Sequence, residues 1–126
     1  MSESIEDYLE KIYIFIKKNK RPIKTTELAN LLNIKPSAVT NMAKKLQKLG
    51  YVNYEPYVGI TLTYKGEEKA KKIYDKHRTI KIFLVEILGV DERKASDEAC
   101  KLEHALSDET LERLKIFIKN FKKRLL

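Results

Sequence analysis

The segment Cys100-Lys101-Leu102-Glu103-His104 contains the only cysteine of the chain and one of its two histidines. On a helix, positions i, i+3 and i+4 share one face, so a thiol, a carboxylate and an imidazole would converge there. These groups are ligands for divalent transition metals such as Mn, Fe, Co and Zn. The pattern also fits a small buried cysteine beside a solvated Glu-His pair. The segment alone therefore leaves both a metal site and ordinary packing open.

Three further donors lie elsewhere in the chain. His77 falls midway along another predicted helix, while Asp7 and Glu10 are spaced i, i+3 near the N-terminus. Each has a structural explanation as well: the two acids could stabilise a helix N-terminus, and the histidine could be a core residue. The candidate metal ligands, on three predicted helices, are Asp7, Glu10, His77, Cys100, Glu103 and His104.

The N-terminal half has the pattern of a winged helix-turn-helix. A short helix, capped by Thr25 or Thr26, ends at Leu32, and Asn33 then suits a left-handed turn. A second helix follows, from about Ser37 to Leu49, with Pro36 in its first turn. The strands expected next are 51–54 and 60–63, rich in aromatic and β-branched residues and separated by a loop with Pro and Gly.

The second helix of this motif has the side chains that a major-groove helix needs. Residues 36–49 contain no acidic residue. Polar side chains near the N-terminal end suit base edges, and the lysines that follow suit phosphates. A winged helix used for protein contacts is the alternative. The candidate DNA-binding residues are Lys35, Ser37, Thr40, Asn41, Lys44, Lys45 and Lys48.

Composition favours a polyanionic partner and a reducing compartment. The net charge is +8, of which residues 1–65 carry +5 and residues 66–126 carry +3. A single cysteine cannot form an internal disulfide, and no signal-peptide segment or apolar run of about 20 residues is present. We therefore expect a cytoplasmic protein that does not contact membranes.

The remaining pattern is helical. Helices are predicted at 4–19, at 64–88 before Gly89, at 92–106, and after a cap at Ser107. The last helix carries an apolar seam suited to a second subunit, made of Leu111, Leu114, Ile118, Phe121 and Leu125. The expected domains are residues 1–71, a winged helix-turn-helix DNA-binding domain, and residues 72–126, a helical dimerisation and metal-binding domain.

Several segments together carry a family resemblance: Asp7-Tyr8-Leu9-Glu10-Lys11-Ile12-Tyr13, Pro36-Ser37-Ala38-Val39-Thr40, Leu62-Thr63-Tyr64-Lys65-Gly66, Lys76-His77-Arg78, and 97–108. With them the chain resembles the metal-dependent repressors related to the manganese transport regulator and the diphtheria toxin repressor. The resemblance implies a mainly α fold, with a winged helix-turn-helix followed by a helical dimerisation domain. It places the family's metal ligands on the six donors named above. It also implies Mn(II) or Fe(II), a double-stranded DNA operator, a homodimer and no organic cofactor.

The resemblance is a hybrid of two branches. Asp7 and Glu10 are typical of the manganese branch, because the iron branch has Met at position 7. Cys100 is typical of the iron branch, because the manganese branch has Glu there. Lys81 and Ser96 stand where the iron branch has a Glu and a His, which argues against an iron-type ancillary site. Since the sequence stops at position 126, we expect no SH3-like third domain.

These observations predict a metal-activated transcriptional repressor of manganese or iron homeostasis genes. The alternative is a winged-helix regulator that answers an organic ligand or none, in which His77, Cys100 and His104 need not converge. An enzyme built on Cys100 and His104 would lack an oxyanion-hole motif. The sequence leaves open the physiological metal, one or two ions per subunit, the operator, the target genes, and whether repression or activation dominates.

Overall fold

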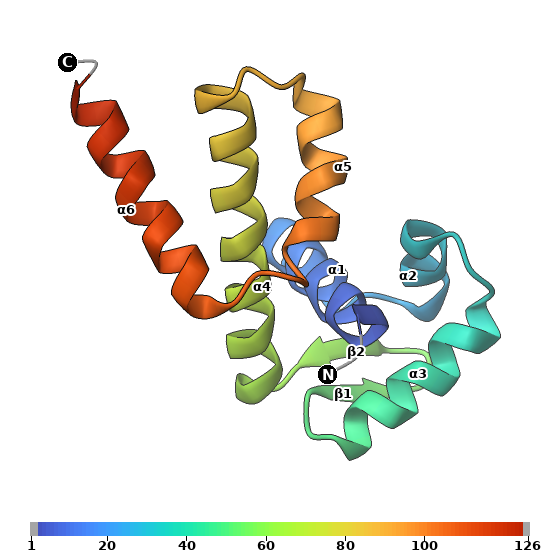
Figure 1. Ribbon diagram of the computed structural model, residues 1–126. Coiled ribbons are helices and arrows are strands. Elements are labelled where there is room, and N and C mark those ends of the chain that lie inside the picture. Colours follow the sequence, from blue (N-terminus) through green and yellow to red (C-terminus); the bar gives the residue numbers. More distant parts are fainter. Residues whose placement is uncertain (1–2, 125–126) are drawn as a thin grey trace. The chain divides into compact units, whose positions relative to one another are not determined.

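The computed structural model describes residues 3–124, with the side chains of residues 5–124. The chain divides into two compact units between residues 71 and 72. The predicted fold class, mainly α with one small sheet, is confirmed. None of the described helices is long and apolar enough to cross a membrane. The elements (Figure 1) are α1 (Glu3–Asn19), α2 (Thr25–Leu32), α3 (Pro36–Lys48), β1 (Val52–Glu55), β2 (Gly59–Leu62), α4 (Tyr64–Ile82), the π-helical turn η1 (Phe83–Ile87), α5 (Glu92–Leu102) and α6 (Asp108–Arg124).

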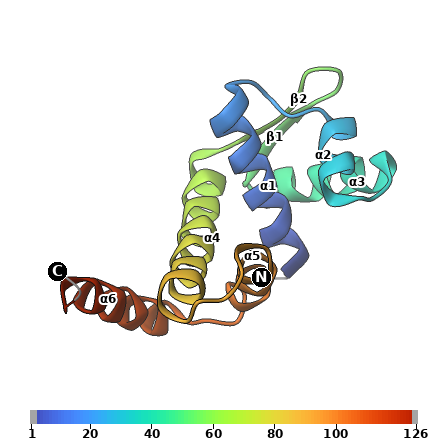
Figure 2. The same ribbon diagram turned by 90° about the horizontal axis from the view of Figure 1, so that it is seen from above.

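The first unit is the predicted winged helix-turn-helix. Helices α2 and α3 pack against each other, as Figure 2 shows. Asn33 takes the expected left-handed conformation between them, with φ 55°, and Pro36 is the first residue of α3. Strands β1 and β2 pair antiparallel, with Val52 opposite Leu62 and Glu55 opposite Gly59. This hairpin is the wing.

One apolar core holds the first unit together. Ile23, between α1 and α2, pairs with Ile60 of β2 through two backbone hydrogen bonds of 3.1 and 2.8 Å. This pairing ties the segment before α2 to the wing. The largest fully buried side chains come from α1, α2, α3 and the hairpin as well as this segment: Leu9, Ile12, Ile23, Leu28, Val39, Leu46, Val52 and Ile60.

The cap of α2 differs from the prediction of Thr25 or Thr26. Lys24 occupies the capping position, and its backbone N–H donates to Glu27 at 2.9 Å. Arg21 donates two further hydrogen bonds to the same carboxylate, at 2.9 and 2.7 Å. These bonds, first from the Arg21 side chain and then from the Lys24 backbone, lower the pKa of Glu27 to about 2. The carboxylate three residues into the helix thus takes over the capping role.

The second unit contains the rest of α4, followed by η1, α5 and α6. The helix predicted to run to residue 88 is α-helical only to Ile82, because its last turn widens into η1 before Gly89. The Leu88 N–H reaches back to the carbonyl of Phe83, at 3.1 Å. A small core of Ile80, Leu84, Ala95 and Ala99 joins α4 and η1 to α5. The two alanines are fully buried, so α5 packs closely.

Helix α5 is shorter than predicted. It ends at Leu102, and the N–H groups of Ala105 and Leu106 then share the Leu102 carbonyl, at 3.0 and 3.1 Å. Glu103 nevertheless keeps helical dihedrals and donates its N–H to Ala99. The predicted cap of α6 is confirmed, because the Ser107 hydroxyl accepts the Thr110 N–H at 3.1 Å.

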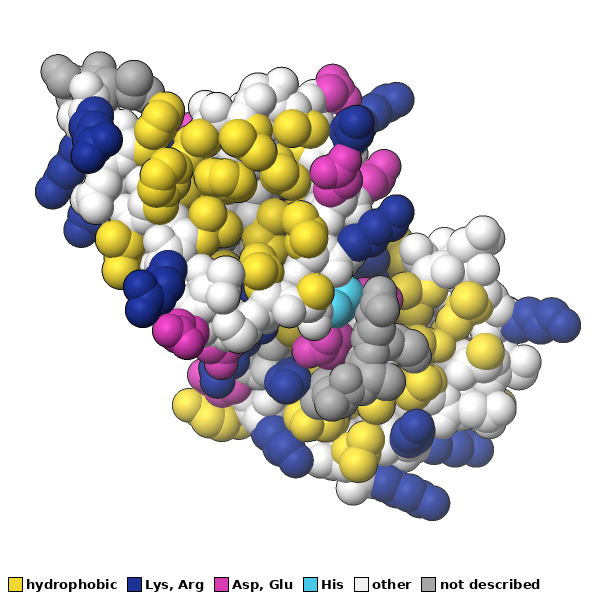
Figure 3. All heavy atoms as spheres, in the orientation of Figure 1, with side chains coloured by type: hydrophobic (Ala, Val, Ile, Leu, Met, Phe, Trp, Pro, Cys, Tyr) yellow, Lys and Arg dark blue, Asp and Glu magenta, His cyan; other side chains and the backbone are white. Residues whose placement is uncertain are grey.

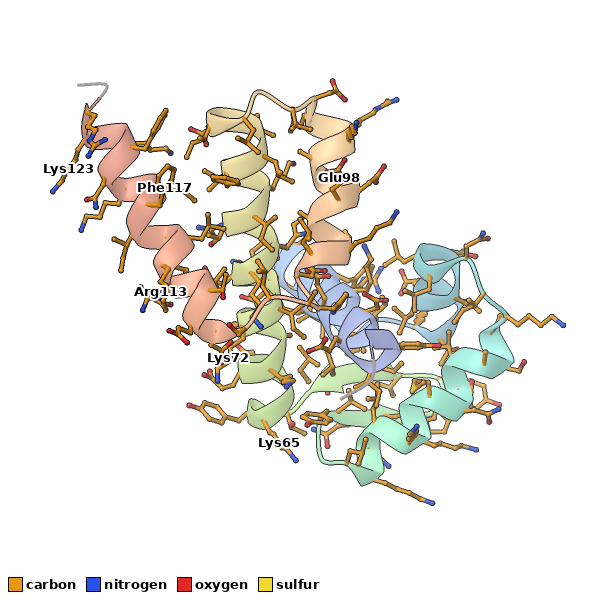
Figure 4. All side chains as sticks on the ribbon, in the orientation of Figure 1. Lys65, Lys72, Glu98, Arg113, Phe117 and Lys123 are labelled. Carbon is orange, nitrogen blue, oxygen red and sulfur yellow. The ribbon has the colours of Figure 1, made fainter. Side chains whose placement is uncertain are left out.

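The predicted seam of α6 is only partly buried. Leu111 and Ile118 face the interior, whereas Leu114 and Phe121 are half-buried and Leu125 lies outside the described residues. On the exposed side, Phe117 (labelled in Figure 4) is 50% exposed. Figure 3 shows apolar side chains gathered on this part of the second unit. A face of this kind suits a partner helix.

Candidate metal centre and DNA-binding face

The second unit brings three of the predicted donors into contact. The Sγ atom of Cys100, at the end of α5, lies 3.6 Å from Nδ1 of His77 on α4. The same nitrogen lies 3.2 Å from Oε2 of Glu103. One donor atom from each of these residues lies within 4.8 Å of the others. A thiol, an imidazole and a carboxylate therefore share one small volume.

Glu103 is the most informative member of this group. Its side chain is fully buried, and His104 flanks it on the other side, with Nε2 3.6 Å from Oε1. Neither carboxylate oxygen makes a hydrogen bond among the described residues. A buried charge without hydrogen bonds is costly unless it is paired or coordinates a metal. The arrangement therefore fits a divalent cation held between the two histidines and the thiol.

Local structure explains how these donors meet. His77 lies in the part of α4 that belongs to the second unit. Cys100 is in the last turn of α5 and follows the buried Ala99, whose small side chain lets α5 approach the core closely. Glu103 and His104 lie in the turn after α5 rather than inside a longer helix. The expected i, i+3 relation between Cys100 and Glu103 survives because the Glu103 backbone stays helical.

The other two predicted donors lie in the first unit. Asp7 and Glu10 are on α1 at i, i+3, so they share one face of that helix. Asp7 is half-buried and Glu10 is buried. The structure thus groups four of the six predicted donors within one unit. The assignment of all six as metal ligands stays a prediction.

The donor set has a distinct chemical character. Thiolate is a soft ligand that favours Fe(II), Co(II) or Zn(II), carboxylates suit harder ions such as Mn(II), and imidazole is accepted by most of them. A site with one sulfur, two nitrogens and one or more oxygens is therefore suited to divalent transition metals. It is poorly suited to Ca²⁺ or Mg²⁺, which take oxygen ligands.

The predicted DNA-binding residues form the outer face of α3. Val39, Ala43 and Leu46 are buried and fix the helix against the core. The Thr40 hydroxyl donates to the Pro36 carbonyl at 3.2 Å, so its proton is already used within the helix. Lys and Arg side chains project over this region in Figure 3. The exposed candidates are Lys35, Ser37, Asn41, Lys44, Lys45 and Lys48, while Thr40 is half-buried.

Two residues that hold α3 in place carry no signal in the sequence. Gln47 looks like a solvated helix residue, yet its Oε1 accepts the N–H of Tyr54 in the wing at 2.7 Å. Lys65, labelled in Figure 4, donates to the carbonyl of Leu49 at 3.0 Å. These partners lie on different elements, so no helical or strand periodicity indicates them. Both contacts fix the C-terminal end of α3.

Two family models together match nearly the whole chain. Residues 1–60 match the family model of the iron dependent repressor N-terminal DNA binding domain, and residues 63–124 match that of the iron dependent repressor metal binding and dimerisation domain. An uncharacterised HTH-type transcriptional regulator from Methanocaldococcus jannaschii is 81% identical over 122 residues, which cover 97% of this chain and 98% of that protein.

Two further relatives are more distant. The HTH-type transcriptional regulator MntR of Lysinibacillus sphaericus is 40% identical over 111 residues, covering 88% of this chain and 78% of that protein. A solved structure of the manganese regulator SloR matches with a TM-score of 0.80 and 34% identity, covering 94% of this chain and 55% of the other. The present chain thus spans about half the length of that solved protein.

Proposed function

Because this chain belongs to the iron-dependent repressor family of metal-dependent, DNA-binding transcriptional repressors, we propose that its metal centre is built on His77, Cys100, Glu103 and His104. Asp7 and Glu10 of α1 complete the ligand set in this proposal. The observation that carries it is the buried Glu103 carboxylate, which has no hydrogen bond among the described residues and lies between two imidazoles. Family members are not enzymes, and none of these residues needs a catalytic role.

The chain's own residues explain why DNA binding would depend on the ion. Asp7, Glu10 and Glu103 carry like charges, which repel one another when they approach. A bound divalent cation supplies the positive charge that offsets this repulsion. Donors from α1 would then be held together with those from α4 and α5, and α1 packs against the wing through β2. Metal binding and the geometry of the DNA-binding unit become linked in this way.

The remaining assignments complete the proposal. Two copies of the chain pair through the apolar face of the second unit, so that two α3 helices meet successive major grooves about 34 Å apart. Ser37 and Asn41 are placed for base edges, with Lys35, Lys44, Lys45 and Lys48 placed for phosphates. The proposed location of the protein is the cytoplasm, where thiols stay reduced. Mn(II) or Fe(II) is the proposed activating ion.

An anaerobic DNA-binding titration with Mn(II), Fe(II), Co(II) and Zn(II) tests the proposal. We expect at least one of these ions to strengthen operator binding roughly 5–150-fold, the range typical of allosteric coupling. The matched control is His104→Ala, which removes one nitrogen donor and should abolish the activation while circular dichroism stays helical. Equal DNA affinity with and without every ion would rule out the metal switch.

A further inference from the structure

Lys76 makes a contact that the metal centre does not explain. It precedes His77 on α4, but its ammonium group reaches across to the connection between α5 and α6. There it donates a hydrogen bond of 2.9 Å to the backbone carbonyl of Leu106. It also lies 3.3 Å from Oδ1 of Asp108, the first residue of α6. The side chain of Lys76 is only 18% exposed.

The segment that Lys76 holds is the one that carries two proposed metal donors. Glu103 and His104 lie at the start of the turn, and Leu106 and Asp108 lie at its end. On the α5 side, the turn is fixed by the N–H groups of Ala105 and Leu106 bonded to Leu102. On the α6 side, Lys76 joins the turn to α4, the helix that also carries His77. One side chain of α4 therefore links the turn that carries Glu103 and His104 to the helix that carries His77.

We propose that Lys76 is a positioning residue of the metal centre, which fixes the 103–107 turn and thereby the spacing of Glu103 and His104 from His77. The inference rests on the proposed metal site. A rigid turn presents its donors at the required separation before the ion arrives, so less ordering accompanies binding. Residues hydrogen-bonded directly to metal ligands typically change metal affinity 10–100-fold when they are altered, and Lys76 acts one contact further away, so we expect the lower end of that range.

Lys81, a second lysine on α4 whose ion pair is more exposed, provides the matched control. Lys81 lies 3.4 Å from Glu92 at the start of α5, with side chains 33% and 77% exposed. This pair also joins α4 to α5, but at the end of α5 away from Glu103. Exposed pairs of this kind contribute little. A general loss of lysine charge on α4 would affect both variants, whereas loss of turn positioning affects only Lys76.

The experiment compares wild type with Lys76→Met, Lys76→Arg and Lys81→Met in the full chain. Co(II) binding is followed through the thiolate-to-cobalt charge-transfer band, and hydrogen exchange of the turn is measured in metal-free protein. We expect Lys76→Met to bind Co(II) about 10-fold more weakly and to exchange the turn amides faster. Lys76→Arg should retain most of the affinity, because its guanidinium can still donate to the carbonyl. Lys81→Met should match wild type.

The outcomes distinguish failure of the proposed metal site from failure of the proposed role of Lys76. Wild-type protein without a charge-transfer band would overturn the metal-site assignment itself. A normal wild-type band, together with unchanged affinity and exchange in Lys76→Met, would overturn only the role of Lys76. Should Lys76→Met not fold, Lys76→Gln replaces it, since Gln is a good helix former and its shorter side chain carries no charge. Wild-type cobalt affinity in Lys76→Gln would equally refute the proposal.

Discussion

His77 and Glu103 come from different elements, yet Nδ1 of one lies 3.2 Å from Oε2 of the other. The contact joins α4 to the turn after α5 inside the second unit. It places a nitrogen and an oxygen donor side by side, with the Cys100 sulfur 3.6 Å from the same nitrogen. Three of the donors proposed as metal ligands are therefore already adjacent within one unit. Changes at these residues should affect metal binding more than folding, which gives the first two predictions.

The substitution Glu103→Gln should separate the effect on metal binding from the effect on folding stability. The amide keeps the shape of the side chain but removes a buried charge whose oxygens have no hydrogen bond among the described residues. Because an unsatisfied buried charge costs more than an unsatisfied neutral amide, the metal-free variant should be as stable as wild type or up to ~1 kcal/mol more stable. Metal affinity should fall at least 10-fold. Urea unfolding and Co(II) titration measure these quantities; a variant that loses stability without losing metal affinity would mean that Glu103 is structural.

The second prediction concerns metal selectivity. Cys100→Glu replaces the soft sulfur with a hard oxygen donor, so the activation profile should move towards Mn(II) and away from Fe(II) or Co(II). Curves of DNA-binding activation by Mn(II) and by Fe(II) are measured on wild type and on Cys100→Glu. The ratio of activation by Mn(II) to activation by Fe(II) in each protein tests the prediction. Cys100→Ser serves as the control, because it removes the sulfur without adding a charge. An unchanged Mn-to-Fe ratio in Cys100→Glu would assign Cys100 to packing.

Sequence patterns predict the local parts of this molecule well. The turn at Asn33, the wing and the cap at Ser107 follow from short-range rules on which residues tolerate which backbone. The end of α5 is predicted too late, because nothing in residues 103–106 marks the amides of Ala105 and Leu106 that share the Leu102 carbonyl. The contacts of Lys76 and Gln47 escape prediction for another reason. Each joins residues on different elements through a side chain and a backbone group, and one sequence contains no signal for such pairs.

The third prediction tests the DNA-binding face. Lys48→Ala should weaken binding to all sequences alike and reduce the slope of log affinity against log salt by about one for each subunit, or about two for the homodimer, because each subunit then neutralises one phosphate fewer. Asn41→Ala should change sequence preference instead, costing about 1–3 kcal/mol at one base pair. Lys94→Ala is the control, since Lys94 is exposed on α5 outside this face. Were Lys48→Ala and Lys94→Ala to behave alike, α3 would not be the recognition helix.

The fourth prediction is a pH dependence of stability. The pKa of Glu27 is lowered from 4.5 to about 2, chiefly by the hydrogen bond from Arg21. A lowered carboxyl pKa stabilises the fold fully above the unfolded value and loses that contribution as pH falls from 4.5 through about 2. Glu27→Gln should therefore be less stable than wild type near neutral pH, by on the order of 1 kcal/mol given solvent screening.

At about pH 2 the two proteins should converge, because the wild-type carboxylate is then becoming protonated as well. Urea unfolding at several pH values measures the difference. Glu109→Gln is the control: Glu109 pairs with Arg113 at 3.3 Å, but both side chains are more than three-quarters exposed. A difference between wild type and Glu27→Gln that is constant with pH would show that the Arg21 pair is not its source.

The fifth prediction concerns the junction between α3 and α4. Gly66 lies in the first turn of α4, where a Cβ would stand 1.9 Å from the backbone oxygen of Tyr51. Alanine normally favours a helix, but here it must displace the chain that follows α3. Gly66→Ala should therefore cost ~3 kcal/mol of stability, at the upper end of overpacking effects. DNA affinity should fall too, because Lys65 and Thr63 hold the carbonyls of Leu49 and Gly50 at the end of α3.

The matched control is Gly89→Ala. Gly89 has a φ of +72°, but no atom lies within 4 Å of the position that a methyl group would take there, so only the backbone preference is lost. That cost is about 1 kcal/mol. If steric contact at Tyr51 governs the junction, Gly66→Ala should be the more destabilising of the two and the only one that weakens DNA binding. Equal losses of stability, with DNA affinity unchanged in both, would mean that the end of α3 does not depend on this close approach.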